Sequence, residues 1–279
     1  MRLYYLFLSF LLIFTCIPTQ TKQNKAIYDD KKYAVLFDVT NVLIKENQAV
    51  ISKKIGFGKL ASYTVTHWRN PGHRCLDMLA TISTHDDQKP RVAIKIQKRI
   101  LPRCFVELHE GEKTCAQVKI EIAHNIELLH TKKYFSSIKE KNLMTDIMDL
   151  VLDPNMIGAC IEPVKSSLQL ARKLKAAGHS IYVVGNAPDE LYAVFQKRYP
   201  DLFDFFDGIV ISSHIKTVKP GPDVFKHVCS TYNLNPQDCI VIDDLEESVA
   251  IAKKLGMQGI VYDKPSNLIR HLKKCGVRF

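Results

Sequence analysis

The sequence lacks a Cys-X-X-Cys pair, and none of its eight cysteines stands near a histidine at the spacing of a zinc site. It also lacks internal repeats and low-complexity tracts. The formal net charge is +10, yet lysine and arginine are spread along the chain, and there is no compact basic block with interleaved aromatic residues. These absences exclude a zinc-binding module and a repeat protein. They also indicate no nucleic-acid partner, so the charge favours no more than a general attraction for anionic substrates.

Long apolar runs are absent too, with one exception at the start of the chain. Residues 3–17 are uncharged and almost wholly apolar, and they follow a short basic start. This run is shorter than the roughly 20 residues that a membrane span needs, and it suits the core of a secretory signal. We therefore predict a signal peptide or N-terminal anchor over residues 1–22. The protein is then exported (periplasmic, secreted or membrane-anchored) and touches a membrane only through this segment, whose cleavage or lipidation stays open.

Apolar runs of strand length follow later in the chain. The first is continuous rather than alternating and ends abruptly at Asp38, which is typical of a strand buried on both faces of a parallel sheet. The later runs end in a similar way, at polar or charged residues. The predicted strands cover residues 33–38, 180–185, 208–212, 239–243 and 259–262.

Helix signals lie between these strands. Pro163, Pro188 and Pro222 each stand at the start of a helical pattern, and Gly178 and Gly256 each stand at the end of one. Strands that alternate with helices in this order predict an α/β fold, a Rossmann-like doubly wound parallel sheet. We assign this core domain to residues 23–45 and 163–279.

Residues 46–162 interrupt the alternation and predict an inserted, mostly α-helical cap. Three segments have helical spacing, at residues 97–109, 114–129 and 136–152. The alternating Val92, Ile94 and Ile96 predict either a short strand or the start of a helix. His67 and Trp68 could line a pocket, although packing or a place on the cap surface is the favoured interpretation for both.

Chemically suitable side chains follow the predicted strands at their carboxyl ends. In a parallel sheet, these ends meet at one edge, where ligands bind. Carboxylates at this edge suit Mg²⁺, a buried strand-end aspartate can act as a nucleophile, and a lysine or an asparagine can bind phosphate. The residues concerned are Asp38, Asn186, Lys219, Asp243 and Asp244.

Four short segments, in this order, resemble the motifs of the haloacid dehalogenase superfamily, and in particular its bacterial sugar-phosphate phosphatases. They are residues 37–43 (FDVTNVL), 184–187 (VGNA), 218–223 (VKPGPD) and 242–248 (IDDLEES). The resemblance covers roughly residues 33–262. The cap lies between the first and second motifs, as in one subclass of the superfamily.

The resemblance implies a magnesium-dependent phosphohydrolase that acts on a small phosphorylated metabolite. Asp38 would attack phosphorus, water would then hydrolyse the aspartyl phosphate, and Lys219 would be the second catalytic residue. The helical cap would close over the substrate and select it. The implied metal ligands are Asp38, the backbone carbonyl of Thr40, Asp243 and Asp244. The implied phosphate ligands are Gly185, Asn186 and Lys219.

Two positions depart from the pattern of that superfamily. Thr40 stands where an aspartate usually acts as general acid and base, and a threonine hydroxyl does not titrate near neutral pH. Gly185 stands where a serine or threonine usually binds the phosphoryl group. The main hypothesis is therefore a phosphohydrolase, whose activity these two replacements could lower. The alternative is a catalytically weakened binding or regulatory protein, and a carbon–halogen hydrolase comes third.

Overall fold

The computed structural model describes residues 31–84, 92–96 and 98–279. The predicted signal peptide over residues 1–22 lies outside the described residues, as does most of the predicted linker after it. Within the described ranges, no helix is both long and apolar enough to cross a membrane. Residues 32–279 form one compact unit.

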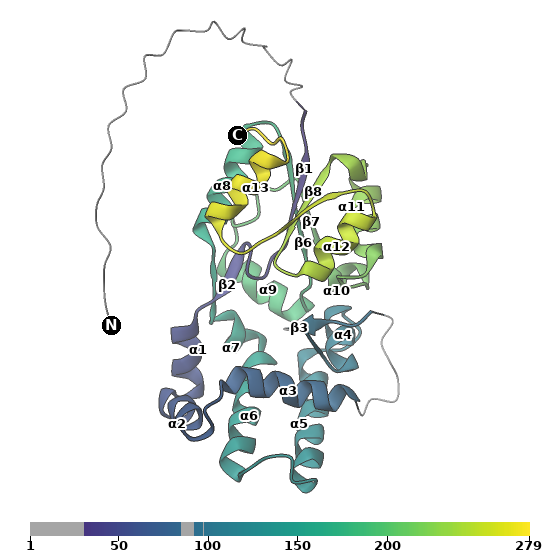
Figure 1. The fold of residues 1–279 in the computed structure, drawn as a ribbon. Coiled ribbons are helices and arrows are strands. Elements are labelled where there is room, and N and C mark those ends of the chain that lie inside the picture. The colour runs from purple at the N-terminus through teal and green to yellow at the C-terminus, as the bar shows by residue number, and fades with distance from the viewer. Residues whose placement is uncertain (1–30, 85–91, 97) are drawn as a thin grey trace, which may run out of the picture. The chain divides into compact units, whose positions relative to one another are not determined.

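A five-stranded parallel sheet forms the centre of one half of this unit (Figure 1). The strand order is β7-β6-β1-β8-β9, so that the chain runs outward in both directions from the central β1. This is the doubly wound α/β arrangement that the sequence predicts, and the fold class is confirmed. The strands are β1 (Ala34–Phe37), β6 (Ser180–Gly185), β7 (Gly208–Ile211), β8 (Cys239–Asp243) and β9 (Gln258–Val261).

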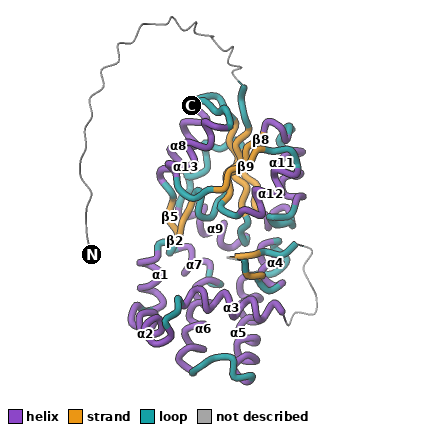
Figure 2. The backbone as a smooth tube through the Cα atoms, viewed as in Figure 1, coloured by secondary structure: helices purple, strands orange, loops and turns teal. Residues whose placement is uncertain are grey.

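Helices cover both faces of the sheet (Figure 2). Successive residues of β1 point to opposite faces, so Val35 packs on one side and Leu36 on the other. Both sides are apolar, which explains the continuous apolar run in the sequence. One face carries α8 (Lys165–Ala176) and α13 (Pro265–Lys274), and the other carries α11 (Pro222–Thr231) and α12 (Glu246–Lys254). The remaining core helices are α9 (Asp189–Arg198), α10 (Ser212–Ile215) and a 3₁₀ turn (Pro236–Asp238).

The chain between β1 and β6 folds mainly into helices, which we call the insert (residues 47–160). The insert has its own hydrophobic cluster, in which Met78, Ile122 and Met144 are fully buried. Its helices are α1 (Gln48–Ile55), α2 (Phe57–His67), α3 (Pro71–Thr84), α4 (Arg103–His109), α5 (Cys115–Thr131), α6 (Ile138–Val151) and α7 (Pro154–Gly158). A small hairpin, β3 (Lys95–Ile96) and β4 (Arg99–Ile100), precedes α4.

Two short antiparallel strands lead into and out of the insert, β2 (Ile44–Glu46) and β5 (Ile161–Pro163). The predicted boundaries of the cap, before residue 46 and after residue 162, fall within this pairing. Because β2 follows directly after β1, the insert lies at the carboxyl end of the parallel strands (Figure 1). The hydroxyl of Ser212, in α10, donates a hydrogen bond of 2.6 Å to the carbonyl of His109, in α4. The insert therefore contacts the sheet domain at the end where the predicted site residues lie.

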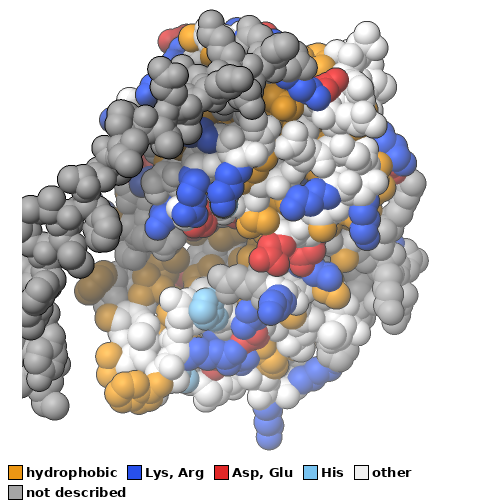
Figure 3. Space-filling model, turned by 45° about the horizontal axis from the view of Figure 1, so that its top comes forward, with side chains coloured by type: hydrophobic (Ala, Val, Ile, Leu, Met, Phe, Trp, Pro, Cys, Tyr) orange, Lys and Arg blue, Asp and Glu red, His pale blue; other side chains and the backbone are white. Residues whose placement is uncertain are grey.

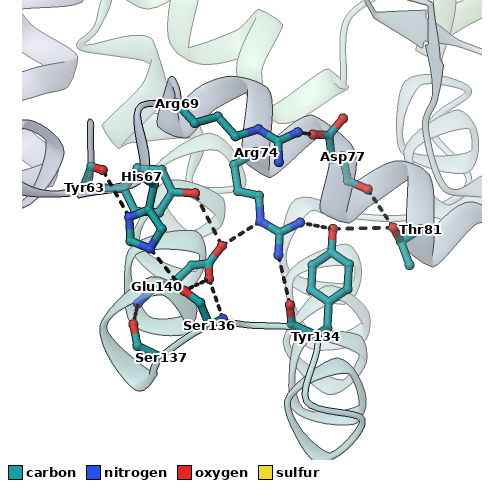
Figure 4. A network of polar contacts seen from close by, with 10 residues as sticks. All are labelled: Tyr63, His67, Arg69, Arg74, Asp77, Thr81, Tyr134, Ser136, Ser137 and Glu140. Carbon is teal, nitrogen blue, oxygen red and sulfur yellow. Dashed lines mark hydrogen bonds and ion pairs between the residues drawn. The ribbon is translucent and has the colours of Figure 1, made fainter. Parts of the chain in front are cut away.

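A buried polar network ties three segments of the insert together (Figure 4). The carboxylate of Glu140 accepts hydrogen bonds from Arg74 Nε, Tyr63 Oη and the backbone N–H and hydroxyl of Ser136. Arg74 also donates to the hydroxyl of Tyr134 and lies over its ring. Since each of these polar groups has a partner, the network stabilises the insert without a buried unpaired charge.

Some element boundaries differ from those that the sequence predicts. The helix predicted over residues 97–109 is wrong in its first part, because β4 occupies Arg99–Ile100 and α4 begins only at Arg103, after Pro102. The alternation of Val92, Ile94 and Ile96 leads into strand β3, so the short strand is the correct one of the two predicted alternatives. Pro163 ends β5 rather than starting a helix, and α8 begins two residues later.

Candidate active site

Asp38 follows the last residue of β1 and is 7% exposed. Its backbone N–H donates to the carbonyl of Ile242 in β8, which continues the parallel pairing by one residue. The chain turns immediately afterwards, with the N–H groups of Leu43 and Ile44 both bonded to the carbonyl of Val39. The end of the central strand thus fixes the backbone of Asp38, and its carboxylate lies among side chains from neighbouring strand ends.

Lys219 brings a buried positive charge to this carboxylate. Its ammonium group lies 2.6 Å from Asp38 Oδ1 and 2.6 Å from Asp243 Oδ2, and its side chain is 4% exposed. The lysine comes from the loop between α10 and α11, whereas Asp38 follows β1 and Asp243 ends β8. Three separate stretches of sequence therefore meet in one buried ion-pair cluster, as expected for side chains at the carboxyl edge of a parallel sheet.

Asp243 and Asp244 complete the acidic part of the site. Carboxylate oxygens of Asp38, Asp243 and Asp244 all lie within 4.8 Å of one another. Asp243 also accepts a hydrogen bond from the N–H of Leu245, and Asp244 accepts one from Asn41 Nδ2. Three carboxylates face one ammonium group, so the cluster carries about two net negative charges when all are ionised. Oxygen donors in this arrangement fit Mg²⁺, which prefers such hard ligands.

The electrostatics of the cluster are set by burial and by these contacts. Burial raises the pKa of Asp38 to about 7, against the opposing effect of Lys219 and with a further increase from Asp243. Burial alone would lower the pKa of Lys219, but Asp243 and Asp38 together hold it above its usual value. Burial also raises the pKa of Asp244, opposed by its hydrogen bond from Asn41. The lysine is therefore charged, and an added cation would favour ionised carboxylates.

Asn186 lies beside Lys219 and holds its backbone. Asn186 Nδ2 donates to the carbonyl of Lys219 at 2.8 Å, and Asn186 Oδ1 accepts from the N–H of Lys219 at 2.9 Å. This reciprocal pair fixes the loop that carries the lysine. One N–H of the amide is left for a phosphoryl oxygen, so the contact that the sequence predicts for Asn186 stays a prediction.

Gly185 ends β6 next to the side chain of Val39. A Cβ atom at residue 185 would lie 2.4 Å from Val39 Cγ2, closer than packed carbon atoms approach each other. The chain therefore requires glycine here as long as valine follows Asp38. This contact gives a packing reason for the missing serine or threonine hydroxyl, which the sequence alone does not provide.

Gly185→Ser is expected to lower the free energy of unfolding by about 1–3 kcal/mol, because the new Cβ overpacks against Val39. Combining it with Val39→Ala removes the obstructing methyl group. The double variant should then lose less stability than the sum of the two single variants, by at least about 1 kcal/mol. Urea denaturation of the four proteins in the cycle measures this coupling. Additive effects would contradict the contact.

Three other residues singled out in the sequence are Thr40, His67 and Trp68. Thr40 is exposed in the turn after Asp38 and forms an isolated bridge with Ile44. Trp68 is 93% exposed and lies on the surface of the insert, in agreement with the favoured interpretation. His67 stacks on Tyr63 and lines an outer cavity of about 540 Å³ between α2 and α6, whose described lining contains none of the strand-end residues. Neither side chain joins the cluster around Asp38.

Two residues that contribute to the site were given no role from the sequence. Asn41 has a positive φ of 62° and donates to Asp244, so the turn after β1 helps to place that carboxylate. Ser212 accepts from the N–H of Ala187 and donates to His109 in the insert. Because Asn41 lies inside the first motif, the sequence could have indicated its role. The role of Ser212 depends on a contact between distant segments, so no local pattern could have indicated it.

Comparison with known proteins finds a matching family and partial relatives. A model of the haloacid dehalogenase-like hydrolase family matches residues 33–256. Fructose-1-phosphate phosphatase YqaB of Escherichia coli (strain K12) is 26% identical over 83 residues, which is 30% of this chain and 44% of that protein. N-acylneuraminate-9-phosphatase of Mus musculus is 32% identical over 66 residues, 23% of this chain and 27% of that protein. The chain thus spans less than half the length of these curated relatives.

Solved structures share the fold. The HAD family enzyme bt-2542 of Bacteroides thetaiotaomicron, in complex with magnesium and inorganic phosphate, superposes with a TM-score of 0.52 at 18% identity. The match covers 86% of this chain and 99% of that one. A structure described as a dehalogenase has a TM-score of 0.52 at 16% identity, covering 88% and 98%. At these identities the likeness shows the fold alone.

Proposed function

Because the chain belongs to the haloacid dehalogenase-like hydrolases, we propose that it hydrolyses a phosphomonoester of a small metabolite, with Asp38 as the nucleophile. The observation that carries this proposal is the buried cluster at the strand ends, where Lys219 lies 2.6 Å from both Asp38 and Asp243. An ion pair at the surface contributes little, whereas buried charges interact more strongly with an anionic substrate because water is excluded. The phosphatase relatives support the same reaction class.

In this proposal each residue has a separate task. Asp38 attacks phosphorus, the alcohol leaves, and water hydrolyses the resulting aspartyl phosphate. Lys219 favours the ionised form of Asp38 and balances the charge of the phosphoryl oxygens. Asn186 holds the lysine loop in place through its two hydrogen bonds. The insert lies over the strand ends and excludes water from the reacting groups.

We propose Mg²⁺ as the cofactor, held by the carboxylates of Asp38, Asp243 and Asp244 and by the backbone carbonyl of Thr40. The bound ion supplies positive charge that reduces the repulsion between an anionic nucleophile and an anionic substrate. The net negative charge of the cluster and its oxygen donors support this assignment. Removal of the metal with EDTA is expected to abolish phosphate release from p-nitrophenyl phosphate, and added Mg²⁺ is expected to restore it.

The affinity for Mg²⁺ is expected to fall as the pH falls below about 7. With the pKa of Asp38 near 7, the metal-free protein holds a proton on this carboxylate at lower pH, and the metal must displace it. Loss of one proton on binding predicts an affinity about tenfold weaker at about pH 6 than at about pH 8. Titration calorimetry at the two pH values measures it. Equal affinities would contradict the assignment of Asp38 as a ligand.

Thr40→Asp is expected to raise kcat if protonation of the leaving alcohol limits the reaction. A carboxylic acid two residues after the nucleophile can donate the proton that a threonine hydroxyl cannot, and such assistance is typically worth about 10²–10⁴-fold. Thr40→Asn is the matched control, because it has nearly the same shape as aspartate but does not titrate. An equal kcat in the aspartate and asparagine variants would show that another step is limiting.

The second candidate function is a binding or regulatory protein that keeps the fold and turns over little. It is favoured by one observation, that Thr40 and Gly185 replace both of the usual assistants of the nucleophile. Hydrolysis is the better supported proposal, because the buried lysine and the three carboxylates are all present. A protein that only binds would hold Mg²⁺ and phosphate without releasing phosphate from any ester, and the EDTA comparison separates the two.

A further inference from the structure

The insert contains a cavity of about 790 Å³. Its walls come mainly from α1, α2, α3, α4 and the second half of α6, with Ile157 of α7, so the lining joins segments that are far apart in the sequence. From this cavity we infer that the organic group of the substrate is apolar and is held inside the insert, while its phosphate lies at Asp38. The inference deepens the proposed phosphohydrolase function and rests on it for the phosphate end.

The lining of the cavity is the first observation. Most of the residues around it are apolar, including Ile51, Leu76, Leu79, Phe105, Met148 and Ile157. Glu46 is the only described lining residue with an acidic or strongly basic side chain. Burial lowers the pKa of His109, so this histidine adds no positive charge to the wall at neutral pH. The polar lining consists of Glu46, Gln48, Ser52, Thr64, Asn70, His73 and His109, and all of these except Ser52 and His109 are exposed.

This lining suits an apolar group better than a sugar. A sugar needs several hydrogen-bond partners for its hydroxyl groups, and burying one without a partner costs free energy. An alkyl or aryl group needs none, and it gains from every apolar contact. The volume lies within the range of about 300–1,000 Å³ that is usual for small-molecule sites. The size therefore suits a substrate whose organic part is larger than an ethyl or propyl group.

The position of the cavity is the second observation. The carbonyl of His109, a lining residue, accepts from Ser212, which in turn accepts from the N–H of Ala187, next to Asn186. On the other side, Val218 precedes Lys219 and belongs to the same hydrophobic cluster as Leu101 and Phe105. Through His109 one wall of the cavity thus joins the loop that carries Asn186, and the hydrophobic cluster around the cavity reaches the residue before Lys219, although the described lining itself contains none of the strand-end residues.

The surface agrees with a substrate that has one apolar and one anionic end. In Figure 3, hydrophobic side chains lie inside a hollow on the face shown, and lysine and arginine side chains lie around it. The net charge of +10 favours approach of the anionic end. Once bound, the phosphate lies at the strand ends and the apolar group lies in the insert.

The test compares n-alkyl phosphates from ethyl to octyl as substrates of the full-length protein in Mg²⁺. We expect kcat/KM to rise about threefold for each added methylene until the cavity is filled. Ile51→Asn places an amide in the wall and is expected to lower kcat/KM for octyl phosphate about tenfold, with little change for ethyl phosphate. Val50→Asn is the matched control, because Val50 is also partly buried on α1 but does not line the cavity.

Several outcomes would overturn the inference. The first is an equal kcat/KM for ethyl and octyl phosphate. The second is a dependence of kcat/KM on chain length that is unchanged in Ile51→Asn. The third is a loss of this dependence in Val50→Asn as large as that in Ile51→Asn. If no ester is hydrolysed, the proposed function fails, but the cavity is still tested by calorimetry with alkyl phosphonates. Tighter binding of octylphosphonate than of ethylphosphonate, lost in Ile51→Asn, then supports an apolar binding site. Equal binding of the two overturns it.

Discussion

Lys219→Met is expected to lower the free energy of unfolding of the metal-free protein by about 3–5 kcal/mol at about pH 8. Methionine fills much of the space of the lysine side chain but leaves the carboxylates of Asp38 and Asp243 buried without a cation. A buried charge without a partner is among the most destabilising changes in a protein interior. Urea denaturation followed by circular dichroism, with EDTA present, measures the loss.

The loss of stability in Lys219→Met should depend on pH and on Mg²⁺. When the carboxylates are protonated at low pH they no longer need the lysine, so the difference from the wild type should shrink as the pH falls. Mg²⁺ should also restore part of the loss, because it supplies another cation at the site. Lys226→Met is the control, since Lys226 is exposed and pairs with Asp223 at 3.1 Å, and it should cost less than about 1 kcal/mol. A loss of less than about 1 kcal/mol in Lys219→Met as well would contradict a buried ion-pair cluster.

Asp38→Asn is expected to lower the rate of phosphate release by about 10⁴-fold or more, the scale seen when a covalent nucleophile is removed. An amide of the same shape keeps the position at the end of β1, but it is a far weaker nucleophile than a carboxylate. The melting curve of the variant should remain cooperative, and this separates loss of chemistry from loss of fold.

A matched control for this variant is Asp149→Asn. Asp149 is a partly exposed aspartate of the insert that pairs with Lys119 at 3.0 Å, far from the cluster in the sequence. Its replacement should leave phosphate release within about twofold of the wild type, since exposed pairs contribute little. Phosphate release by Asp38→Asn at a rate close to that of the control would remove Asp38 from the mechanism.

The sheet and the cluster of acidic and basic residues could be predicted because their signals are local. A strand buried on both faces must be apolar throughout, and residues 33–38 show this together with the polar residue that ends the run. The topology of a doubly wound sheet then brings all strand ends to one edge. The ion pairs of Lys219 with Asp38 and Asp243 follow from this rule, although they join segments about 180 and 24 residues apart.

The features that the sequence did not predict depend on contacts between distant segments. The requirement for glycine at residue 185 comes from the side chain of Val39, on another strand. The bond from Ser212 to His109 joins the sheet domain to the insert. The cavity forms only when several helices of the insert are in their final positions, and no single helix reveals it. Within the insert, α4 begins only after Pro102, later than the helical spacing predicted, and hairpin β3–β4 occupies the residues before it.

Thr40 makes the reaction intermediate of the proposed mechanism accessible to experiment. Without a carboxylate two residues after the nucleophile, no general base in that position activates water for the second step. With p-nitrophenyl phosphate, whose leaving group needs little protonation, the aspartyl phosphate should therefore break down more slowly than it forms and accumulate during turnover. A phosphorylated Asp38 would link the buried cluster directly to catalysis.

The most direct measurement is acid quenching of the wild-type protein during turnover of a phosphomonoester in Mg²⁺, followed by mass spectrometry of its peptides. The expected result is a phosphoryl group, labile to hydroxylamine, on the peptide that contains Asp38, and its absence from Asp38→Asn. Steady release of phosphate with no phosphoryl group on this peptide at any quench time, and at an equal rate in Asp38→Asn, would contradict the assignment of Asp38 as the nucleophile.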